Sequence, residues 1–181
     1  MGDGSSVLWL DVLNTNGNEV WWTNKIRGLY WGTEANDDTL YILDTTLGFT
    51  DTGTSCIYGP SLMIAYIKDL IMPMIPDLTD ASNWGYTFDC GIRSSLPSFW
   101  LLYGDYWFEV TPEDYVVEVN VNNVCALCLY GRSSNDYWIL GDAFMRGWYN
   151  IHDHTNERFG FIPFPDSPKT TPTAVSEEPN T

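Results

Sequence analysis

Short apolar runs, separated by polar stretches, dominate the beginning of the chain. Runs of β-branched and aromatic residues cover positions 7–13, 20–22, 26–31 and 40–43. Stretches rich in asparagine and aspartate, at positions 14–18 and 35–38, separate them. Because strands bounded by such turn residues produce this pattern, the first forty residues predict strands joined by hairpin turns.

The strand pattern continues in the second half. Apolar runs at 99–103 and 106–110 flank Gly104 and Asp105, a pair that is typical of a two-residue hairpin turn. Further runs lie at 115–121 and 124–130. The pattern as a whole therefore predicts an all-β fold.

One segment has helical spacing instead. Apolar residues recur between Pro60 and Ile71 at intervals of three and four, and a proline is favourable near the first position of a helix. The apolar positions are Met63, Ile64, Ile67, Leu70 and Ile71. We expect a mostly β domain with two short helices, of which this is the clearer.

Composition and charge narrow the functional classes. The 181 residues, 15% of them aromatic, suffice for one domain with a well-filled core. With only 8 Lys and Arg and a net charge of -16, the chain lacks the basic stripe that binds nucleic acid. The same deficit disfavours a membrane surface, and no apolar run reaches the roughly 18 residues needed for membrane insertion.

The two ends differ in composition from the centre. The first six residues lack the charged and apolar regions of a signal peptide. After residue 164, proline, threonine and serine are abundant and apolar periodicity disappears, which is typical of disorder. We expect a leader or the edge of a truncation at 1–6, the domain at 7–164 and a disordered tail at 165–181.

An acidic residue in a tight turn is the strongest candidate for chemistry. Asp51 precedes Thr52 and Gly53, directly after a predicted strand and shortly before the predicted helix. A carboxylate displayed on a loop suits catalysis. The triplet alone would occur by chance in roughly a few per cent of chains of this length, so by itself it is compatible with an ordinary turn.

Several separated motifs accompany this turn in a fixed order. They are Asp51-Thr52-Gly53-Thr54-Ser55, Gly59-Pro60, residues 95–99, Ile139-Leu140-Gly141, residues 148–153 and residues 158–163. In order and spacing they resemble the C-terminal lobe of the pepsin-like (family A1) aspartic endopeptidases. The resemblance covers roughly residues 7 to 164 and implies one lobe of the pepsin-like double-ψ β-barrel.

The resemblance implies a role for each residue of the turn. Asp51 would be one of two catalytic aspartates, and Thr54 would donate a hydrogen bond to its carboxylate. Thr52 would reach across to the equivalent residue of a second lobe, while Gly53 would let backbone and substrate approach closely. The active-site loop ends with Ser55. The strand that would support the loop from beneath contains Ile139, Leu140 and Gly141.

The implied chemistry needs two carboxylates. Two acids a few ångströms apart share one proton, so one activates a water while the other polarises the peptide carbonyl. The sequence has no second Asp-Thr-Gly or Asp-Ser-Gly and no recognisable flap hairpin. We therefore expect peptide or protein substrates, a requirement for an N-terminal lobe or a second copy, and an internal start at Met1. The alternative is a catalytically inactive, protease-derived module for binding or assembly.

Four cysteines permit two disulfides in any of three connectivities. The resemblance implies a bond from Cys90 to a partner about forty residues on. It favours Cys128 as that partner, with Cys125 as the alternative. Cys56 has no counterpart in the resemblance, and a bond to the unused member of that pair stays open.

Two patterns that could bind metal lack further ligands. Cys125 and Cys128 have Cys-x-x-Cys spacing but lie in a strand pattern, and His152 and His154 alternate without a third ligand nearby. We expect no metal and no cofactor. Most of the tryptophans fall in predicted strands, where we expect them in the core. Family resemblance and cysteines together predict secretion or residence in an acidic vesicle, such as a lysosome or vacuole.

Overall fold

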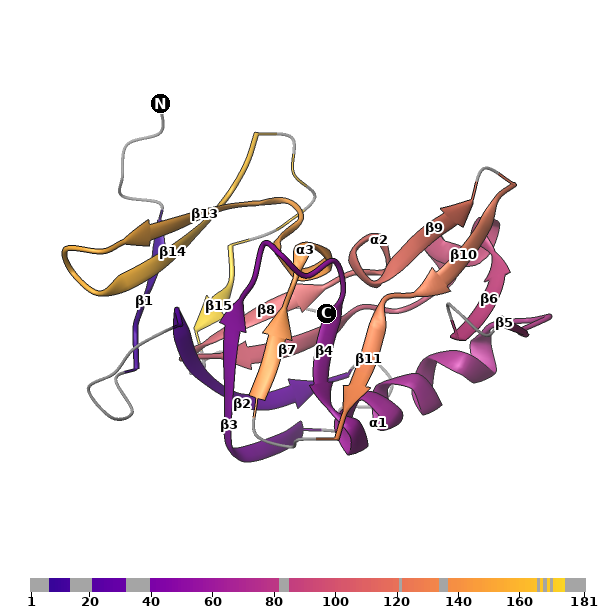
Figure 1. The fold of residues 1–181 in the computed structure, drawn as a ribbon, viewed down its shortest axis with the longest axis horizontal. Helices are drawn as coiled ribbons and strands as arrows, with labels where there is room; N and C mark the ends of the chain where they lie inside the picture. Colours follow the sequence, from indigo (N-terminus) through magenta and orange to yellow (C-terminus); the bar gives the residue numbers. More distant parts are fainter. Residues whose placement is uncertain are drawn as a thin grey trace.

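Three β-sheets form most of the protein in a computed structural model, which is drawn in Figure 1. It describes residues 7–13, 21–31, 40–81, 85–120, 122–133, 137–165, 167, 169 and 171–174. The expectation of a mostly β chain is confirmed. The turns predicted at 14–18 and 35–38 and the leader predicted at 1–6 lie outside the described residues.

The largest sheet has eight strands in the order β11-β4-β12-β3-β2-β7-β8-β15. Most neighbours are antiparallel, but β12 runs parallel to β3, and β11 runs parallel to β4. Strand β12 therefore lies between two strands that are consecutive in the sequence, β3 and β4. The strands are β2 (Thr23–Tyr30), β3 (Leu40–Thr50), β4 (Ile57–Pro60), β7 (Phe99–Tyr103), β8 (Tyr106–Val110), β11 (Leu129–Arg132), β12 (Tyr137–Leu140) and β15 (Thr173–Ala174).

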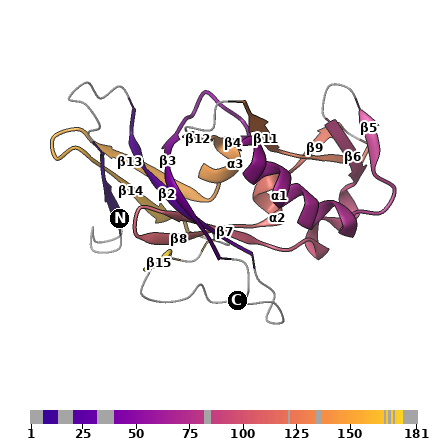
Figure 2. The same cartoon turned by 90° about the horizontal axis from the view of Figure 1, so that it is seen from below.

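Two smaller sheets lie at opposite ends of the molecule, as Figures 1 and 2 show. One has the order β1-β14-β13, and the other has the order β5-β6-β10-β9. Their strands are β1 (Leu8–Asp11), β13 (Trp148–Asp153), β14 (Arg158–Pro163), β5 (Thr79–Ala81), β6 (Gly85–Asp89), β9 (Val116–Asn120) and β10 (Val124–Leu127). All their pairings are antiparallel.

The predicted helix is confirmed as α1 (Ser61–Ile71), which follows Pro60 directly. It buries Ile64, Ile67 and Ile71 on one face, as the apolar spacing requires. Four shorter helical segments bring the described total above the two that we expected. They are η2 (Met72–Met74), η3 (Cys90–Ser95), α2 (Pro112–Tyr115) and α3 (Asp142–Met145).

Aromatic side chains fill the core between the large sheet and the sheet of β13 and β14. Tyr103, Phe108 and Phe161 are almost fully buried, and their rings meet edge-on or tilted at centroid distances of 5.0 to 6.3 Å. Such geometries add to the free energy gained from apolar burial. Four tryptophans are buried as expected, whereas Trp21 is 58% exposed. The buried ones are Trp100, Trp107, Trp138 and Trp148.

The disulfides connect Cys56 to Cys128 and Cys90 to Cys125. The favoured Cys90–Cys128 pairing is therefore wrong, and the alternative, Cys90–Cys125, is present. The predicted run at 124–130 is in fact two strands, β10 and β11, which belong to different sheets. Cys125 lies on β10, which pairs with β6 in the small sheet, while Cys128, just before β11, lies beside the start of β4.

The disorder predicted for residues 165–181 is wrong for Lys169 and residues 173–174, which have defined contacts. Residues 173–174 form β15, which pairs with the edge strand β8 in register Thr173 to Trp107. Lys169 is 6% exposed and makes an ion pair with the buried Asp114. The segment was predicted to be disordered because it has few apolar residues. Backbone pairing with β8 and the ion pair between Lys169 and Asp114 fix these residues without an apolar face.

The disulfide between Cys56 and Cys128 closes the longer of the two loops, since its cysteines lie 72 residues apart. Replacing both with alanine should lower the free energy of unfolding by roughly 4 kcal/mol, because the unfolded chain regains the entropy of an open loop. Urea denaturation of the double variant Cys56→Ala, Cys128→Ala measures this loss. A midpoint equal to that of the unaltered chain would contradict the expectation.

Candidate active site

Asp51 lies at the point where β3 ends and the chain turns toward β4. Its backbone N–H donates to the Leu140 carbonyl at 3.1 Å, so the parallel pairing of β3 with β12 extends to Asp51 itself. In that pairing Ile139 lies opposite Phe49 and Leu140 lies opposite Thr50. The position of Asp51 is thus fixed by a strand that is distant in the sequence.

The carboxylate of Asp51 is oriented by its own loop. One oxygen, Oδ1, accepts a hydrogen bond from the backbone N–H of Gly53 at 2.9 Å. The other, Oδ2, accepts from the Thr54 hydroxyl at 2.6 Å, and the Thr54 N–H donates to the Asp51 carbonyl at 3.2 Å. Both carboxylate oxygens therefore have a fixed direction, which a freely rotating surface aspartate would not have.

The chain that follows β12 supports the loop from behind. The N–H of Gly141 donates to the Cys56 carbonyl at 3.2 Å, and the Asp142 N–H donates to the Thr54 carbonyl at 2.8 Å. A third bond joins the Ala143 N–H to the Ser55 carbonyl at 2.9 Å. Three successive amides, those of residues 141–143, thus satisfy three carbonyls of the segment 54–56.

Gly141 has no room for a side chain. A Cβ at this position would collide with the backbone carbonyl oxygens of Thr54 and Cys56. Close backbone approach, and not a left-handed conformation, is therefore the reason for glycine here. A similar contact supports β4, where the ring of the fully buried Trp138 occupies the place of a Cβ on Gly59.

The front of the loop is open. Thr52, Gly53 and Ser55 are exposed, whereas Asp51 and Thr54 are half-buried. The carboxylate of Asp51 therefore keeps partial access to solvent on a loop whose other residues are largely exposed.

An aromatic row that the sequence analysis missed runs beside the loop. Phe49, two residues before Asp51 on β3, stacks on Trp21 with ring centroids 5.0 Å apart, and Tyr137 packs on Phe49 at 5.7 Å. Arg132 lies 4.5 Å from the centre of the Tyr137 ring and donates to its hydroxyl at 2.7 Å. Alternation along a strand places residues two apart on one face, and this signal could have linked Phe49 to Asp51.

The histidines lie away from Asp51, on β13 and the turn after it. Trp22 stacks on His152 at 4.7 Å and meets His154 edge-on at 5.4 Å. Partial burial lowers the pKa of His152. Within the described ranges no three His, Cys, Asp or Glu side chains gather as a metal site would require, and none of the helices there is long and apolar enough to cross a membrane.

Comparison with known proteins places the chain in a family. The family described as eukaryotic aspartyl protease matches residues 4–164. The chain is 30% identical to cathepsin D of Gallus gallus over 159 residues, which cover 77% of this chain and 37% of that protein. It is also 30% identical over 159 residues to the vacuolar aspartic protease of Candida albicans, with 87% and 35% covered.

Pepsin A of Bos taurus is 27% identical over 171 residues, which cover 88% of this chain and 44% of that protein. The matched stretch therefore spans less than half the length of each of these three relatives. The expected pepsin-like fold and family are confirmed by these matches together with the mostly β architecture.

Adding a methyl group at Gly141 should disturb the support of the loop. We expect Gly141→Ala to lower the free energy of unfolding by about 1–3 kcal/mol, because the new Cβ meets two backbone carbonyls that cannot move independently. Chemical denaturation followed by tryptophan fluorescence measures the change. Ser55→Ala, at an exposed position of the same loop, is the control and should stay within about 0.5 kcal/mol of the unaltered chain.

Proposed function

Since the chain belongs to the eukaryotic aspartyl protease family, we propose that it is a lobe of an aspartic endopeptidase in which Asp51 is one of two catalytic carboxylates. The observation that carries the proposal is the geometry at Asp51. Its two oxygens are oriented by Gly53 and Thr54, on a loop whose front is open. A carboxylate held in this way is prepared to face a second acid and a water molecule.

The proposed reaction is hydrolysis of a peptide bond by a water that the acid pair activates. Two carboxylates close together cannot both ionise easily, so the pair holds one shared proton. The ionised member takes a proton from water, which attacks the peptide carbonyl, while the protonated member donates to the carbonyl oxygen. Proton transfer to the leaving amine then completes the cleavage. Asp51 alone supplies only one of these two functions.

The second carboxylate is proposed to come from another lobe. The chain contains a single Asp-Thr-Gly triplet, and its match covers 35 to 44% of the three relatives. An N-terminal half that carries the other aspartate is the partner we favour, and a second copy of this chain is the alternative. The exposed Thr52 would then contact the equivalent residue of the partner.

The proposed substrates are peptides with apolar side chains next to the cleaved bond. Support comes from the aromatic row. The exposed ring of Trp21 stacks on Phe49, and Phe49 lies two residues before Asp51 on the same strand. Apolar walls with a few polar groups are the usual lining of such sites. The rest of the substrate would bind as an extended chain along the strands.

A secretory or acidic-vesicle location is proposed for this lobe. Two disulfides are typical of proteins that fold in oxidising compartments. One of the relatives is named as a vacuolar protease, which agrees with this location.

The decisive experiment is a cleavage assay at about pH 4, where aspartate pairs can hold one proton. The chain is assayed alone and mixed with the N-terminal half of a relative such as the Candida albicans vacuolar protease, while molecular mass is recorded. We expect cleavage that pepstatin inhibits and Asp51→Asn abolishes, whereas Asp69→Asn, a change at an exposed carboxylate on α1, keeps it.

The possible results separate the alternatives. Activity of a dimer of the chain alone would identify a second copy as the partner, and activity only in the mixture would identify an N-terminal lobe. A folded lobe that binds its complement but stays inactive, with Asp51 intact, would contradict the catalytic proposal and support a binding or assembly module.

In the active complex, Trp21→Ala should lower kcat/KM for peptides with large apolar residues about tenfold, because one exposed aromatic wall and its contact energy are lost. Tyr149→Ala, which removes an equally exposed ring from β13, is the matched control and should leave kcat/KM unchanged. Equal effects of both substitutions would refute a role for Trp21 in substrate binding.

A further inference from the structure

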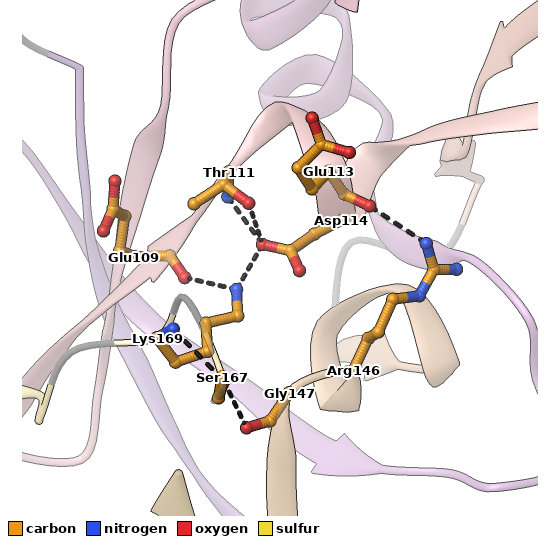
Figure 3. A network of polar contacts seen from close by, with 8 residues as sticks. All are labelled: Glu109, Thr111, Glu113, Asp114, Arg146, Gly147, Ser167 and Lys169. Atoms are coloured by element: carbon orange, nitrogen blue, oxygen red, sulfur yellow. Dashed lines mark hydrogen bonds and ion pairs between the residues drawn. The ribbon is translucent and has the colours of Figure 1, made fainter. Parts of the chain in front are cut away.

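The described residues of the C-terminal segment form what we call the strap: Pro165, Ser167, Lys169 and 171–174. It leaves the end of β14 and reaches the edge strand β8, where it forms β15. Its anchor is the side chain of Lys169, which points into a corner between β8 and α2 (Figure 3). Nothing in the Asp51 chemistry uses this corner.

The anchor is a buried ion pair. The side chains of Lys169 and Asp114 are 2% and 3% exposed, and the ammonium also donates to the Glu109 carbonyl at 3.3 Å. Desolvation lowers the pKa of Lys169, and the charge of Asp114 opposes that shift. Removing one member of such a pair leaves an uncompensated buried charge, which is strongly destabilising.

The Asp114 oxygen that binds Lys169, Oδ2, also accepts two hydrogen bonds from Thr111. It accepts from the backbone N–H of Thr111 at 2.6 Å and from the Thr111 hydroxyl at 2.8 Å, so it caps the short helix α2. Lys169 therefore binds a carboxylate whose position is already fixed by local structure. The site for the lysine is preorganised.

The strap also holds the turn that follows α3. The hydroxyl of Ser167 donates to the Gly147 carbonyl at 2.8 Å and accepts from the Lys169 N–H at 3.2 Å. Gly147 has a φ of +90°, and a Cβ there would lie 2.8 Å from the Lys169 Cγ. Arg146 joins α3 to α2 by donating to the Glu113 carbonyl at 2.9 Å (Figure 3).

The other end of α3 supports the candidate catalytic loop. The amides of Asp142 and Ala143 in its first turn bind the carbonyls of Thr54 and Ser55. A continuous series of hydrogen bonds and backbone thus leads from the strap, through α3, to the loop of Asp51. A helix of four residues, such as α3, has little stability of its own. We therefore expect a change at one end of α3 to affect the hydrogen bonds at its other end.

We propose that the strap is a releasable clasp, locked by Lys169 in the Asp114 corner, whose release loosens α3 and the loop that carries Asp51. Apart from the ion pair of Lys169, the strap is attached to the domain mainly through β15. β15 has two residues, so its ladder with β8 contributes few hydrogen bonds. Short pairings of this kind open readily when nothing else holds them. The only reliance on the proposed function is that the loop is catalytic.

Trypsin tests the lock in the full chain, because it cleaves after lysine and Lys169 is buried. In Asp114→Asn, cleavage after Lys169 should become at least about tenfold faster, since proteolysis follows the population of the open state. Glu113→Gln, the same type of change at the neighbouring exposed carboxylate, is the control and should leave the rate unchanged. Equal rates in both variants would overturn the proposal.

Hydrogen exchange tests the connection to the loop without any protease assay. The amides of Asp142 and Ala143 should exchange at least about tenfold faster in Asp114→Asn than in Glu113→Gln. Unchanged exchange there, with the strap released, would refute the coupling while leaving the catalytic proposal intact.

A second variant leaves Lys169 and Asp114 unchanged. It tests the proposal even if Asp114→Asn unfolds the whole lobe. Ser167→Ala removes only the hydrogen bond to Gly147 and the acceptor for the Lys169 amide. Faster cleavage after Lys169 in this variant, with unchanged exchange in β7, supports a releasable strap. Cleavage at the rate of the unaltered chain would refute it.

Discussion

The passage of β12 between β3 and β4 is the constraint on which the rest of the structure depends. A chain segment more than 80 residues downstream of the Asp51 loop occupies the gap between the strands on either side of that loop. Its amides then satisfy the loop carbonyls, and its glycine makes room for them. The native position of Asp51 therefore depends on contacts with a segment distant in the sequence, so the site and the global fold are coupled.

The loop itself shows how a carboxylate can be kept both oriented and partly exposed. Among the described residues, the hydrogen bonds to the Asp51 carboxylate come from Gly53 and Thr54, while the segment after β12 binds the backbone of the loop. The orientation of the carboxylate is therefore set locally, and its position is set by a segment distant in the sequence. This division leaves Thr52, Gly53 and Ser55 exposed.

Local patterns were sufficient for much of the fold. Apolar spacing located α1 and the hairpin of β7 and β8 within a residue, and separated motifs located the Asp51 loop and its support. The errors came where the environment of a segment depends on distant parts of the chain. The run at 124–130 changes sheet before Cys128, which places Cys125 and Cys128 in different sheets, a separation that the resemblance behind the favoured pairing did not reveal. The strap is held by one lysine in a composition typical of disorder. The exposure of Trp21 was not predictable, because its ring stacks on Phe49 of a different segment.

The disulfides are nested along the sequence, with Cys90 and Cys125 both inside the segment bounded by Cys56 and Cys128. A backbone break between residues 91 and 124 would therefore leave two fragments joined by two covalent bonds, with the Asp51 loop still tied to β11. The two fragments would separate only if both disulfides were reduced, so a cut in that interval would change the mass of the chain under reducing conditions and not under oxidising ones.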